Sequence, residues 1–523
     1  MEEEDDLENQ EILHDFVALQ ATEKSLYDAL NNNNNNNLHE YNDRLINSDY
    51  EFLEQNKKTR NREDADLTEE HHRSNKQSAN SDVSESEPLE MYDDFLLRSD
   101  SDNDVSESEP LEMYDDFLLR SDSGKSNNKS RGKKQDMPKK KKEFVDLKSL
   151  LLQCAQAVAD LDKRTVNDLM KRIRHYSSPQ GDGAERVSHY FANALESRLS
   201  GNGTSLLAVY NYKRTSVSEI LKAHKMLITA CPFMTMSNLF AKQTLMKLAK
   251  GATTLHVVDF GILFGFQWPC LIQALSERPG GPPKLRITGI DFPQPGFRPA
   301  ERIEDTGQRL SKYCERFRVP FEYNAIAQKW ETIRPEDLKI EKDEVVVVNC
   351  IYKLHTVMDE ADTVNSPRDA VFNLMKKINP DMFVHGVVNA TYNTPFFVAR
   401  FREAFFHFSA LFDMFEATED EDQKIRVAFE EHVFGKGMMN IIACEGKDRI
   451  ERPETYKQWE FRTRRAGFRQ LPIDGEIVKC VAKVKTDYYY HKDFSVDEDG
   501  EWIVLGWKGR VIHAISCWQP VSR

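Results

Sequence analysis

The sequence LHVVDFGILFGFQW, residues Leu255–Trp268, decides the fold of this chain. It begins with a short apolar run that ends on an acid, Asp259. A turn with two glycines follows, Gly261 and Gly265, and an apolar helix then begins near Trp268. This is the order of the opening strand–turn–helix unit of a doubly wound α/β domain. Glycine at these positions relieves the crowding where a strand turns into a helix.

A unit of this kind often binds a nucleotide-like cofactor at the N-terminus of its helix. In this chain Leu263 replaces the second glycine of a G-x-G pattern, and its side chain would stand where a ligand phosphate or ribose approaches the backbone. We therefore interpret the turn as structural and expect no cofactor. If a ligand does bind, the candidate residues are Asp259, Gly261, Gly265 and Asp291, the last at the end of the next predicted strand. An acid in that place binds a ribose in many such folds, but it also often caps the following helix.

Strands and helices are predicted to alternate beyond this unit. We expect strands at 255–260, 284–291, 321–326, 343–350, 381–388 and 439–444, with helices at 299–318, 367–378, 396–415 and 454–466. The last part differs, because 477–484, 502–505 and 511–518 are spaced like antiparallel strands. Parallel strands with an antiparallel C-terminal end are the order of class I methyltransferases. The expected fold class is therefore α/β, with a methyltransferase-like Rossmann core.

Helical periodicity precedes the core. Leu147, Leu150, Leu151, Cys154, Val158 and Leu161 make one apolar stripe, and further helices are predicted at 164–175, 181–199, 216–231 and 233–250. Leu147 to Leu151 also matches an L-x-x-L-L docking motif, but its place in the stripe favours packing in the core. We therefore expect a domain over 143–523, with a helical cap mainly at 143–250 and a Rossmann-like core mainly at 251–523.

Charge is distributed unevenly along the chain, whose net charge is −15 over 523 residues. Residues 1–124 carry 35 acids and 10 bases, a net charge of −25, and residues 125–142 carry nine bases and one acid, a net charge of +8. The remainder, 143–523, is left near neutral at +2. An acidic region repels nucleic acid, and a near-neutral domain has no overall electrostatic reason to bind it.

The eight cysteines are scattered, without a C-x-x-C pair or a Cys/His cluster at metal spacing. We expect reduced thiols in the core and a reducing compartment. No apolar run approaches the roughly 20 residues that a membrane span needs, and the start at Met1–Asp6 is acidic, unlike a signal peptide. The sequence has no G-x-S-x-G, H-E-x-x-H or P-loop motif, so we predict no catalytic residue and no metal ligand.

Residues 1–142 are rich in Asp, Glu, Ser and Asn, with an unbroken asparagine run from Asn31 to Asn37. Such a composition cannot bury enough apolar surface to offset chain entropy, so we expect this acidic region to be disordered. It contains an internal repeat. The sequence DVSESEPLEMYDDFLLRSDS occupies 82–101 and returns without change at 104–123.

Each copy of the repeat places aromatic and leucine side chains among acids. This composition is typical of acidic activation segments that fold on a coactivator. The candidate activation residues are Leu89, Tyr92, Phe95 and Leu96 in the first copy and Leu111, Tyr114, Phe117 and Leu118 in the second. The alternative interpretation is an inert duplicated linker.

A basic stretch at 125–142 follows the repeat. Its two basic clusters, separated by a short spacer, resemble a nuclear import signal. The candidate import residues are Arg131, Lys133, Lys134, Lys139, Lys140, Lys141 and Lys142. A solvated linker, or a loose contact to nucleic acid, is the alternative interpretation.

Five motifs in order show a family resemblance from about residue 144 to the end. They are a leucine-rich stretch at 147–206, a VHIID-like motif at His256, Val257, Val258 and Asp259, a second and leucine-poor stretch at 310–320, a PFYRE-like motif at Pro395, Phe396, Phe397, Arg402 and Glu403, and a C-terminal motif with Arg452, Trp459, Gly467, Trp507 and Trp518. In this order they resemble the GRAS (scarecrow-like) transcription regulators of plants. Two departures are small: Phe397 stands where a tyrosine is usual, and Cys517 interrupts the final Ser-Ala-Trp. The acidic repeats are similar to N-terminal motifs of one GRAS branch known for transcriptional activation.

The resemblance implies a helical cap on a Rossmann-like core, a nuclear location and gene control through partner proteins. It implies DNA-binding transcription factors and coactivators as partners, allows a homo- or heterodimer of GRAS domains, leaves direct DNA binding open and implies no membrane. The alternative function is an S-adenosylmethionine-dependent methyltransferase that acts on a small molecule. Micromolar binding of S-adenosylmethionine in calorimetry would distinguish that enzyme from a non-enzymatic co-activator.

Overall fold

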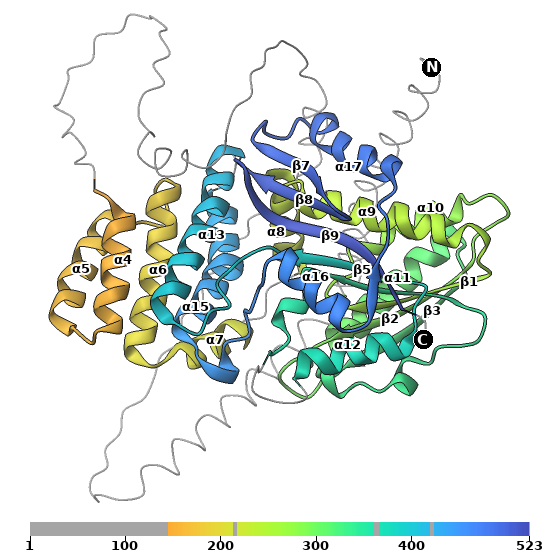
Figure 1. Cartoon of the computed structure of the whole chain (residues 1–523), viewed down its shortest axis with the longest axis horizontal. Coiled ribbons are helices and arrows are strands. Elements are labelled where there is room, and N and C mark those ends of the chain that lie inside the picture. Colours follow the sequence, from red (N-terminus) through yellow and green to blue (C-terminus); the bar gives the residue numbers. More distant parts are fainter. Residues whose placement is uncertain (1–144, 213–216, 360–365, 419–422, 522–523) are drawn as a thin grey trace, which may run out of the picture. The chain divides into compact units, whose positions relative to one another are not determined.

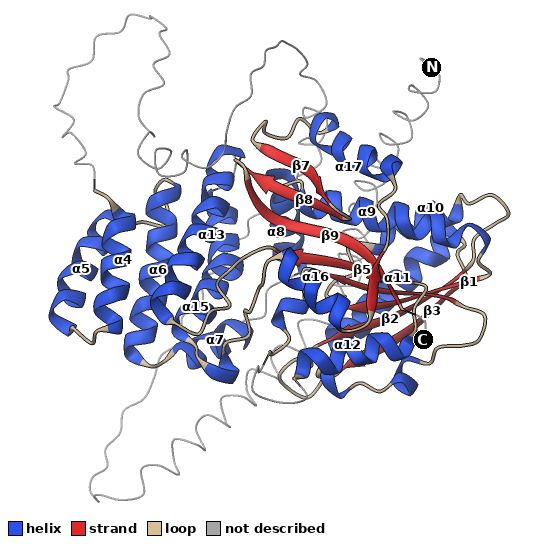
Figure 2. Cartoon of the chain, in the orientation of Figure 1, coloured by secondary structure: helices blue, strands red, loops and turns tan. Residues whose placement is uncertain are grey.

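The computed structural model describes residues 145–212, 217–359, 366–418 and 423–521. The acidic region, its repeats and the basic stretch lie outside the described residues. The described part combines a layer of helices with a twisted sheet that is flanked by helices (Figures 1 and 2). The mixed α/β fold predicted from the sequence is therefore confirmed.

The described residues form a nine-stranded sheet with the order β3-β2-β1-β4-β5-β9-β8-β7, and β6 pairs with β9. The parallel strands are β1 (Thr254–Phe260), β2 (Lys284–Asp291), β3 (Phe321–Ala327), β4 (Val345–Ile351) and β5 (Met382–Val388). The antiparallel end consists of β6 (Phe468–Gln470), β7 (Phe494–Asp499), β8 (Trp502–Trp507) and β9 (Arg510–Pro520). Strand β1 lies between β2 and β4. The chain adds β2 and β3 on one side of β1 and then crosses over to add β4 and β5 on the other side.

Both faces of the sheet are covered, which explains why the central strands are apolar almost throughout. One face packs on α9 (Phe233–Leu248), α10 (Trp268–Ser276), α11 (Glu301–Phe317) and α17 (Gly475–Asp487). The other face packs on α12 (Pro367–Ile378) and α16 (Tyr456–Arg465). Val257 belongs to the first of these cores and Val258 to the second, as the period of two in a strand requires.

A layer of helices lies beside the sheet. It contains α4 (Leu147–Ala159), α5 (Lys163–Tyr176), α6 (Gly183–Ser200) and α7 (Gly203–Tyr212), and it also takes α13 (Phe397–Thr418) and α15 (Lys436–Ala443) from much later in the chain (Figure 1). Helix α6 packs against α4, α13 and α15. Phe191 of α6 makes edge contacts with the rings of Phe401, Phe405 and Phe408 of α13. The three leucines of the L-x-x-L-L segment of α4 are buried, as their place in the apolar stripe predicted. The prediction for Leu161, also placed in that stripe, is wrong: this residue follows the end of α4 at Ala159 and is 82% exposed.

The remaining elements are short or connect the two parts. They are α8 (Val217–Ala230), α14 (Gln423–Phe429), a π-helix (Glu430–Gly435) and 3₁₀ helices at Ala249–Gly251, Trp330–Thr332, Pro335–Leu338, Leu354–Thr356 and Gly446–Asp448. No helix in the described part of the chain is both long and apolar enough to span a membrane.

Two predicted strands are wrong. Residues 439–443 lie in α15, which ends just before Cys444, and residues 477–484 lie in α17. In α17 the buried residues are Ile477, Val481 and Val484, a spacing of four and three that belongs to a helix. The β-branched residues in that segment give it an intrinsic preference for a strand, but tertiary packing overrides this preference. Strands β6 and β7 and helix α7 were not predicted.

Candidate functional site

Asp259 lies at the carboxyl edge of the sheet, beside the glycine turn, and its side chain is almost fully buried. The indole nitrogen of Trp268 donates a hydrogen bond of 2.9 Å to one carboxylate oxygen, and the side-chain amide of Asn349 donates one of 2.9 Å to the other. Asn349 is the residue of β4 that pairs with Asp259 in the sheet. The carboxylate thus joins β1, β4 and α10, and burial raises its pKa to about 7.

The glycine turn packs closely against side chains from other parts of the chain. Gly261 and Gly265 have φ of +99° and +67°, and Leu263 between them has φ of +48°. A Cβ on Gly261 would lie 2.6 Å from Cγ of Lys353, and one on Gly265 would lie 2.8 Å from Cγ2 of Thr306. The positive φ angles and these close approaches both demand glycine. This geometry favours a structural turn.

Asp291, the acid at the end of β2, has protein partners for both oxygens. A guanidinium nitrogen of Arg302 donates to it at 2.7 Å, and the backbone N–H of Phe292 donates at 2.8 Å. Arg302 comes from α11, so the acid ties β2 to the helix that follows. This contact is an ion pair and not the helix cap considered as an alternative, since the N-cap residue of α11 is Ala300 and makes no side-chain hydrogen bond.

We expect the unfolding free energy to report the raised pKa of Asp259. An unfolded aspartate has its ordinary pKa near 3.8, so between about pH 4 and pH 7 the folded state holds a proton that the unfolded state has lost. The contribution of Asp259 is therefore complete below about pH 4 and is lost as the pH rises through 7, by up to about 1.4 kcal/mol per pH unit. The Asp259→Asn variant cannot lose this proton. Urea unfolding of both proteins from pH 4 to pH 8 should show the parent losing stability relative to the variant up to about pH 7, with a constant difference above it. A difference that does not depend on pH would contradict the assignment.

The other residues of the VHIID-like motif are buried in the sheet. The two ring nitrogens of His256 contact Oε2 of Glu344 at 2.9 Å and the hydroxyl of Thr288 at 2.9 Å. Burial lowers the pKa of His256 despite the neighbouring carboxylate. Val257 and Val258 point to opposite faces and are fully buried. The motif therefore holds the central strand in place.

The PFYRE-like motif lies partly at the surface. Pro395 is exposed, and 76% of Phe396 is exposed. Arg402 is half-exposed, 3.5 Å from Glu403. Arg400, which was not predicted from the sequence, is fully buried on the same helix. No local signal separates Arg400 from Arg402, because which face of α13 is buried depends on helices distant in sequence.

Arg400 belongs to a group that we call the arginine cluster: Arg198, Arg400, Arg449 and Arg452. Arg400 donates to the backbone carbonyls of Ile441, Thr394 and Pro395, and it pairs with Glu445. Arg198 donates to the carbonyl of Ile442 and pairs with Glu445 at 2.7 Å. These two side chains satisfy carbonyls at the C-terminal end of α15. Arg452 of the C-terminal motif lies in the same cluster.

The remaining residues of the C-terminal motif are packed inside the protein. Trp459, Trp507 and Trp518 are all buried. Gly467 has φ of +92°, and a Cβ there would lie 2.2 Å from Nζ of Lys376. The indole nitrogen of Trp507 donates to Asp413 of α13 at 2.7 Å, which ties β8 to the helical layer.

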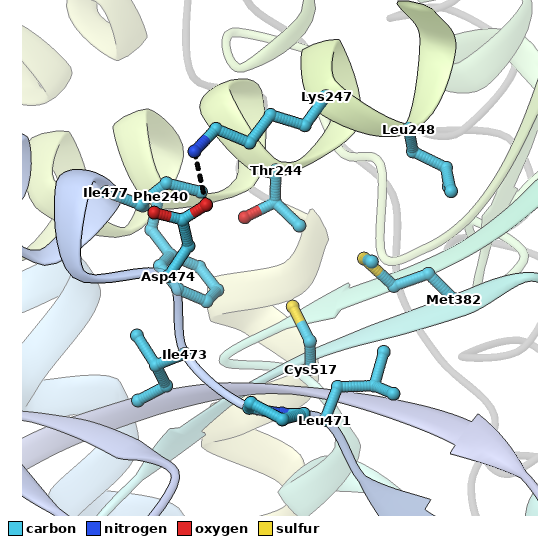
Figure 3. Close-up of a pocket in the computed structure, with 11 residues that line it drawn as sticks. Phe240, Thr244, Lys247, Leu248, Met382, Leu471, Ile473, Asp474, Ile477 and Cys517 are labelled. Atoms are coloured by element: carbon cyan, nitrogen blue, oxygen red, sulfur yellow. Dashed lines mark hydrogen bonds and ion pairs between the residues drawn. The ribbon is translucent and has the colours of Figure 1, made fainter.

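A pocket of about 320 Å³ lies between α9, β5, β9 and α17 (Figure 3). Phe240, Met382, Leu471, Ile477 and Cys517 make most of its wall apolar, and an ion pair between Lys247 and Asp474 crosses one side. Burial raises the pKa of the Cys517 thiol to about 12, so this thiol is not a nucleophile at neutral pH. The described residues contain no group of His, Cys, Asp and Glu side chains that could hold a metal ion.

Comparison with known proteins places these features in a family. The GRAS domain family model matches residues 147–519. The chain is 48% identical to Scarecrow-like protein 14 of Arabidopsis thaliana over 466 residues, which is 88% of this chain and 60% of that protein. It is 52% identical to Scarecrow-like protein 9 of the same plant over 384 residues, 73% of this chain and 53% of that protein. The crystal structure of SCL7 from Oryza sativa matches with a TM-score of 0.61 and 28% identity, covering 72% of this chain and 100% of that one. The chain thus spans between half and two thirds of the length of these two Arabidopsis relatives.

Proposed function

Because this chain belongs to the GRAS domain family, we propose that it is a nuclear regulator of plant transcription that activates genes through partner transcription factors. The observation that carries this proposal is that one chain contains both a GRAS domain, at 147–519, and a duplicated acidic and aromatic segment, at 82–101 and 104–123. The similarity to Scarecrow-like protein 14 covers 88% of the chain, so it continues into the acidic region before residue 145.

The geometry of the carboxyl edge supports a binding module more than a methyltransferase. Asp259 is engaged by Trp268 and Asn349, and Lys353 and Thr306 occupy the space beside the two glycines. S-adenosylmethionine would have to displace these contacts before its ribose could bind to Asp259 or Asp291. We therefore propose no cofactor for this edge.

We also propose that large apolar side chains on the surface of the domain contact partners. Phe297, Phe396, Phe461 and Tyr489 are between 67% and 98% exposed. Such side chains are frequent anchors in protein interfaces. DNA-binding transcription factors and coactivators are the partners proposed, with a second GRAS domain as a further one. The near-neutral charge of residues 143–523 gives the domain no general attraction for DNA.

The basic stretch supports the proposed location. Its nine bases within 125–142 stand between the acidic region and the domain, in two clusters that transport receptors could recognise. We propose Arg131, Lys133, Lys134 and Lys139 to Lys142 as the import residues.

A reporter assay tests the activation proposal. With the acidic region fused to a heterologous DNA-binding domain, alanine at Phe95, Leu96, Phe117 and Leu118 should remove most of the reporter output. The physical reason is that these side chains would supply the apolar contacts, while the acids keep them soluble and exposed. One intact copy should keep a substantial part of the output, because two copies raise apparent affinity without a new contact.

The matched control changes charge and leaves the apolar side chains in place. Replacing Asp93, Asp94, Asp115 and Asp116 by asparagine removes the acids beside the same phenylalanines. This variant should retain more output than the alanine variant. If the alanine variant activates as well as the parent, negative charge or another segment is responsible and the repeat is a linker.

A further inference from the structure

The arginine cluster carries more positive charge than its protein surroundings neutralise. Four guanidinium groups lie around one carboxylate, that of Glu445, which leaves a net charge of +3. Glu445 pairs with Arg198 and Arg400. Arg449 and Arg452 are only 5% and 8% exposed, and neither forms an ion pair with a carboxylate of the described residues. Buried charges in proteins are normally paired, because an unpaired one is strongly destabilising.

The hydrogen bonds of these two arginines leave a donor unused. Arg452 donates to the backbone carbonyls of Arg449 at 2.9 Å and Gly446 at 2.7 Å. Arg449 makes one long bond of 3.4 Å to the side-chain oxygen of Asn393, and its Nε is buried without a partner in the described part of the chain. Burial, together with the charges of Arg400 and Arg452, lowers the pKa of Arg449 to about 10. The site thus lacks one strong acceptor.

Neighbouring acids are engaged elsewhere. Asp448 accepts from the hydroxyl of Thr204 at 3.2 Å, and Glu451 pairs with His355 at 3.0 Å. Glu454 is shared between Arg462 and Arg368. None of these carboxylates approaches Arg449 or Arg452 closely enough to form an ion pair.

The cluster lies close to the surface, where two loops meet. Residues 445–448 follow α15 and are exposed, and Pro395 and Phe396 precede α13 and are exposed as well. Half of the Glu445 side chain is exposed. The loops beside the cluster are therefore exposed to solvent, although Arg449 and Arg452 themselves are buried.

We propose that the arginine cluster is a binding site for a phosphate group, either free or carried by a phosphorylated side chain of a partner. Phosphate brings up to two negative charges, which suits a net charge of +3 better than the single charge of a carboxylate. The Nε edge of a guanidinium presents parallel N–H donors that fit two oxygens of one phosphate. The inference does not depend on the proposed function, because the ligand can be measured on the protein alone.

Thermal unfolding of the full chain tests the proposal. At equal ionic strength, inorganic phosphate should raise Tm by about 2–4 °C over chloride or acetate, since a ligand that binds only the folded state stabilises it. The Arg449→Met variant should lose this rise. It should also be at least as stable as the parent in chloride, because it replaces an unpaired buried charge by an apolar side chain of similar length.

Arg186→Met is the matched control, because Arg186 is equally buried but pairs with Glu430 and Glu416. It should melt lower than the parent and keep the full response to phosphate. Titration calorimetry of inorganic phosphate and of O-phosphoserine on the parent protein, which needs no variant, separates the two sources. Tighter binding of O-phosphoserine points to a phosphorylated partner, and equal binding points to free phosphate.

Several results would overturn the proposal. Equal Tm in phosphate, acetate and chloride would mean that the cluster binds no phosphate. An undiminished response in Arg449→Met would place the phosphate on other basic residues. A marked loss of stability of Arg449→Met in chloride would show that the arginine is already neutralised in the free protein.

Discussion

Replacing Trp518 by alanine is expected to lower the free energy of unfolding by about 3–5 kcal/mol. Trp518 is completely buried on β9, opposite Phe383 of β5 on one side and Gln470 of β6 on the other. Its ring lies 6.0 Å from that of Trp502, and its indole nitrogen donates to the hydroxyl of Ser516 at 2.8 Å. Alanine would leave a large cavity where the parallel and antiparallel parts of the sheet join.

Chemical denaturation followed by circular dichroism would measure this loss. Trp507→Ala should lose a similar amount, because Trp507 is buried on β8, packs 4.7 Å from the ring of Phe494 and donates to Asp413. Phe461→Ala is the control for an aromatic side chain at the surface, since 67% of Phe461 is exposed, and it should change stability by less than about 0.5 kcal/mol. An unchanged Tm of Trp518→Ala with lost partner binding would assign that residue to an interface instead.

The second large effect is expected at Arg186, where methionine should cost about 3–5 kcal/mol. Arg186 of α6 is 2% exposed and donates to Glu430 at 2.9 Å, and it also pairs with Glu416. Glu430 is fully buried, and after the substitution its main partner would be Arg426, at 3.4 Å. The free energy of unfolding falls because the Glu430 carboxylate stays buried without its arginine partner.

The pH dependence of the Arg186→Met variant follows from Glu430. Burial raises the pKa of Glu430 above its ordinary value of 4.5 even in the parent, and removing Arg186 raises it further. A folded-state pKa above the unfolded one means that the protonated form stabilises the fold at low pH and that this stability is lost as the pH rises through the folded pKa. The deficit of the variant should therefore be smaller at pH 5 than at pH 8.

Two further variants separate the buried pair from an ordinary ion pair. Arg186→Met combined with Glu430→Gln should recover most of the lost stability, because it removes the stranded charge. Arg298→Met breaks the exposed pair with Glu301 and should cost less than about 1 kcal/mol. Equal losses at Arg186 and Arg298 would show that burial does not control the energy of these pairs.

Elements with local sequence signals could be predicted from the sequence alone. The strand, turn and helix around Asp259 were predicted because an apolar run, two glycines and the start of an apolar helix follow one another within 14 residues, Leu255–Trp268. Strand β1 begins and ends within one residue of the prediction. Strand β2 and helix α12 have the predicted bounds. The family was likewise found from motifs in order, and the match over residues 147–519 confirms it.

Tertiary structure decided the features that depend on distant residues. The apolar segments 439–444 and 477–484 are long enough for a strand or for two turns of helix, and packing against α6 and α9 selected the helix in both. Arg186 and Glu430 are 244 positions apart, so no local pattern distinguishes this pair from a solvated arginine and glutamate. The same holds for the burial of Arg400 and Arg449 and for the missing counterion of Arg449, which appear only when α6, α13 and α15 come together. Periodicity reports how a residue relates to its neighbours in sequence, whereas burial and pairing are set by whichever segments the folded chain brings against it.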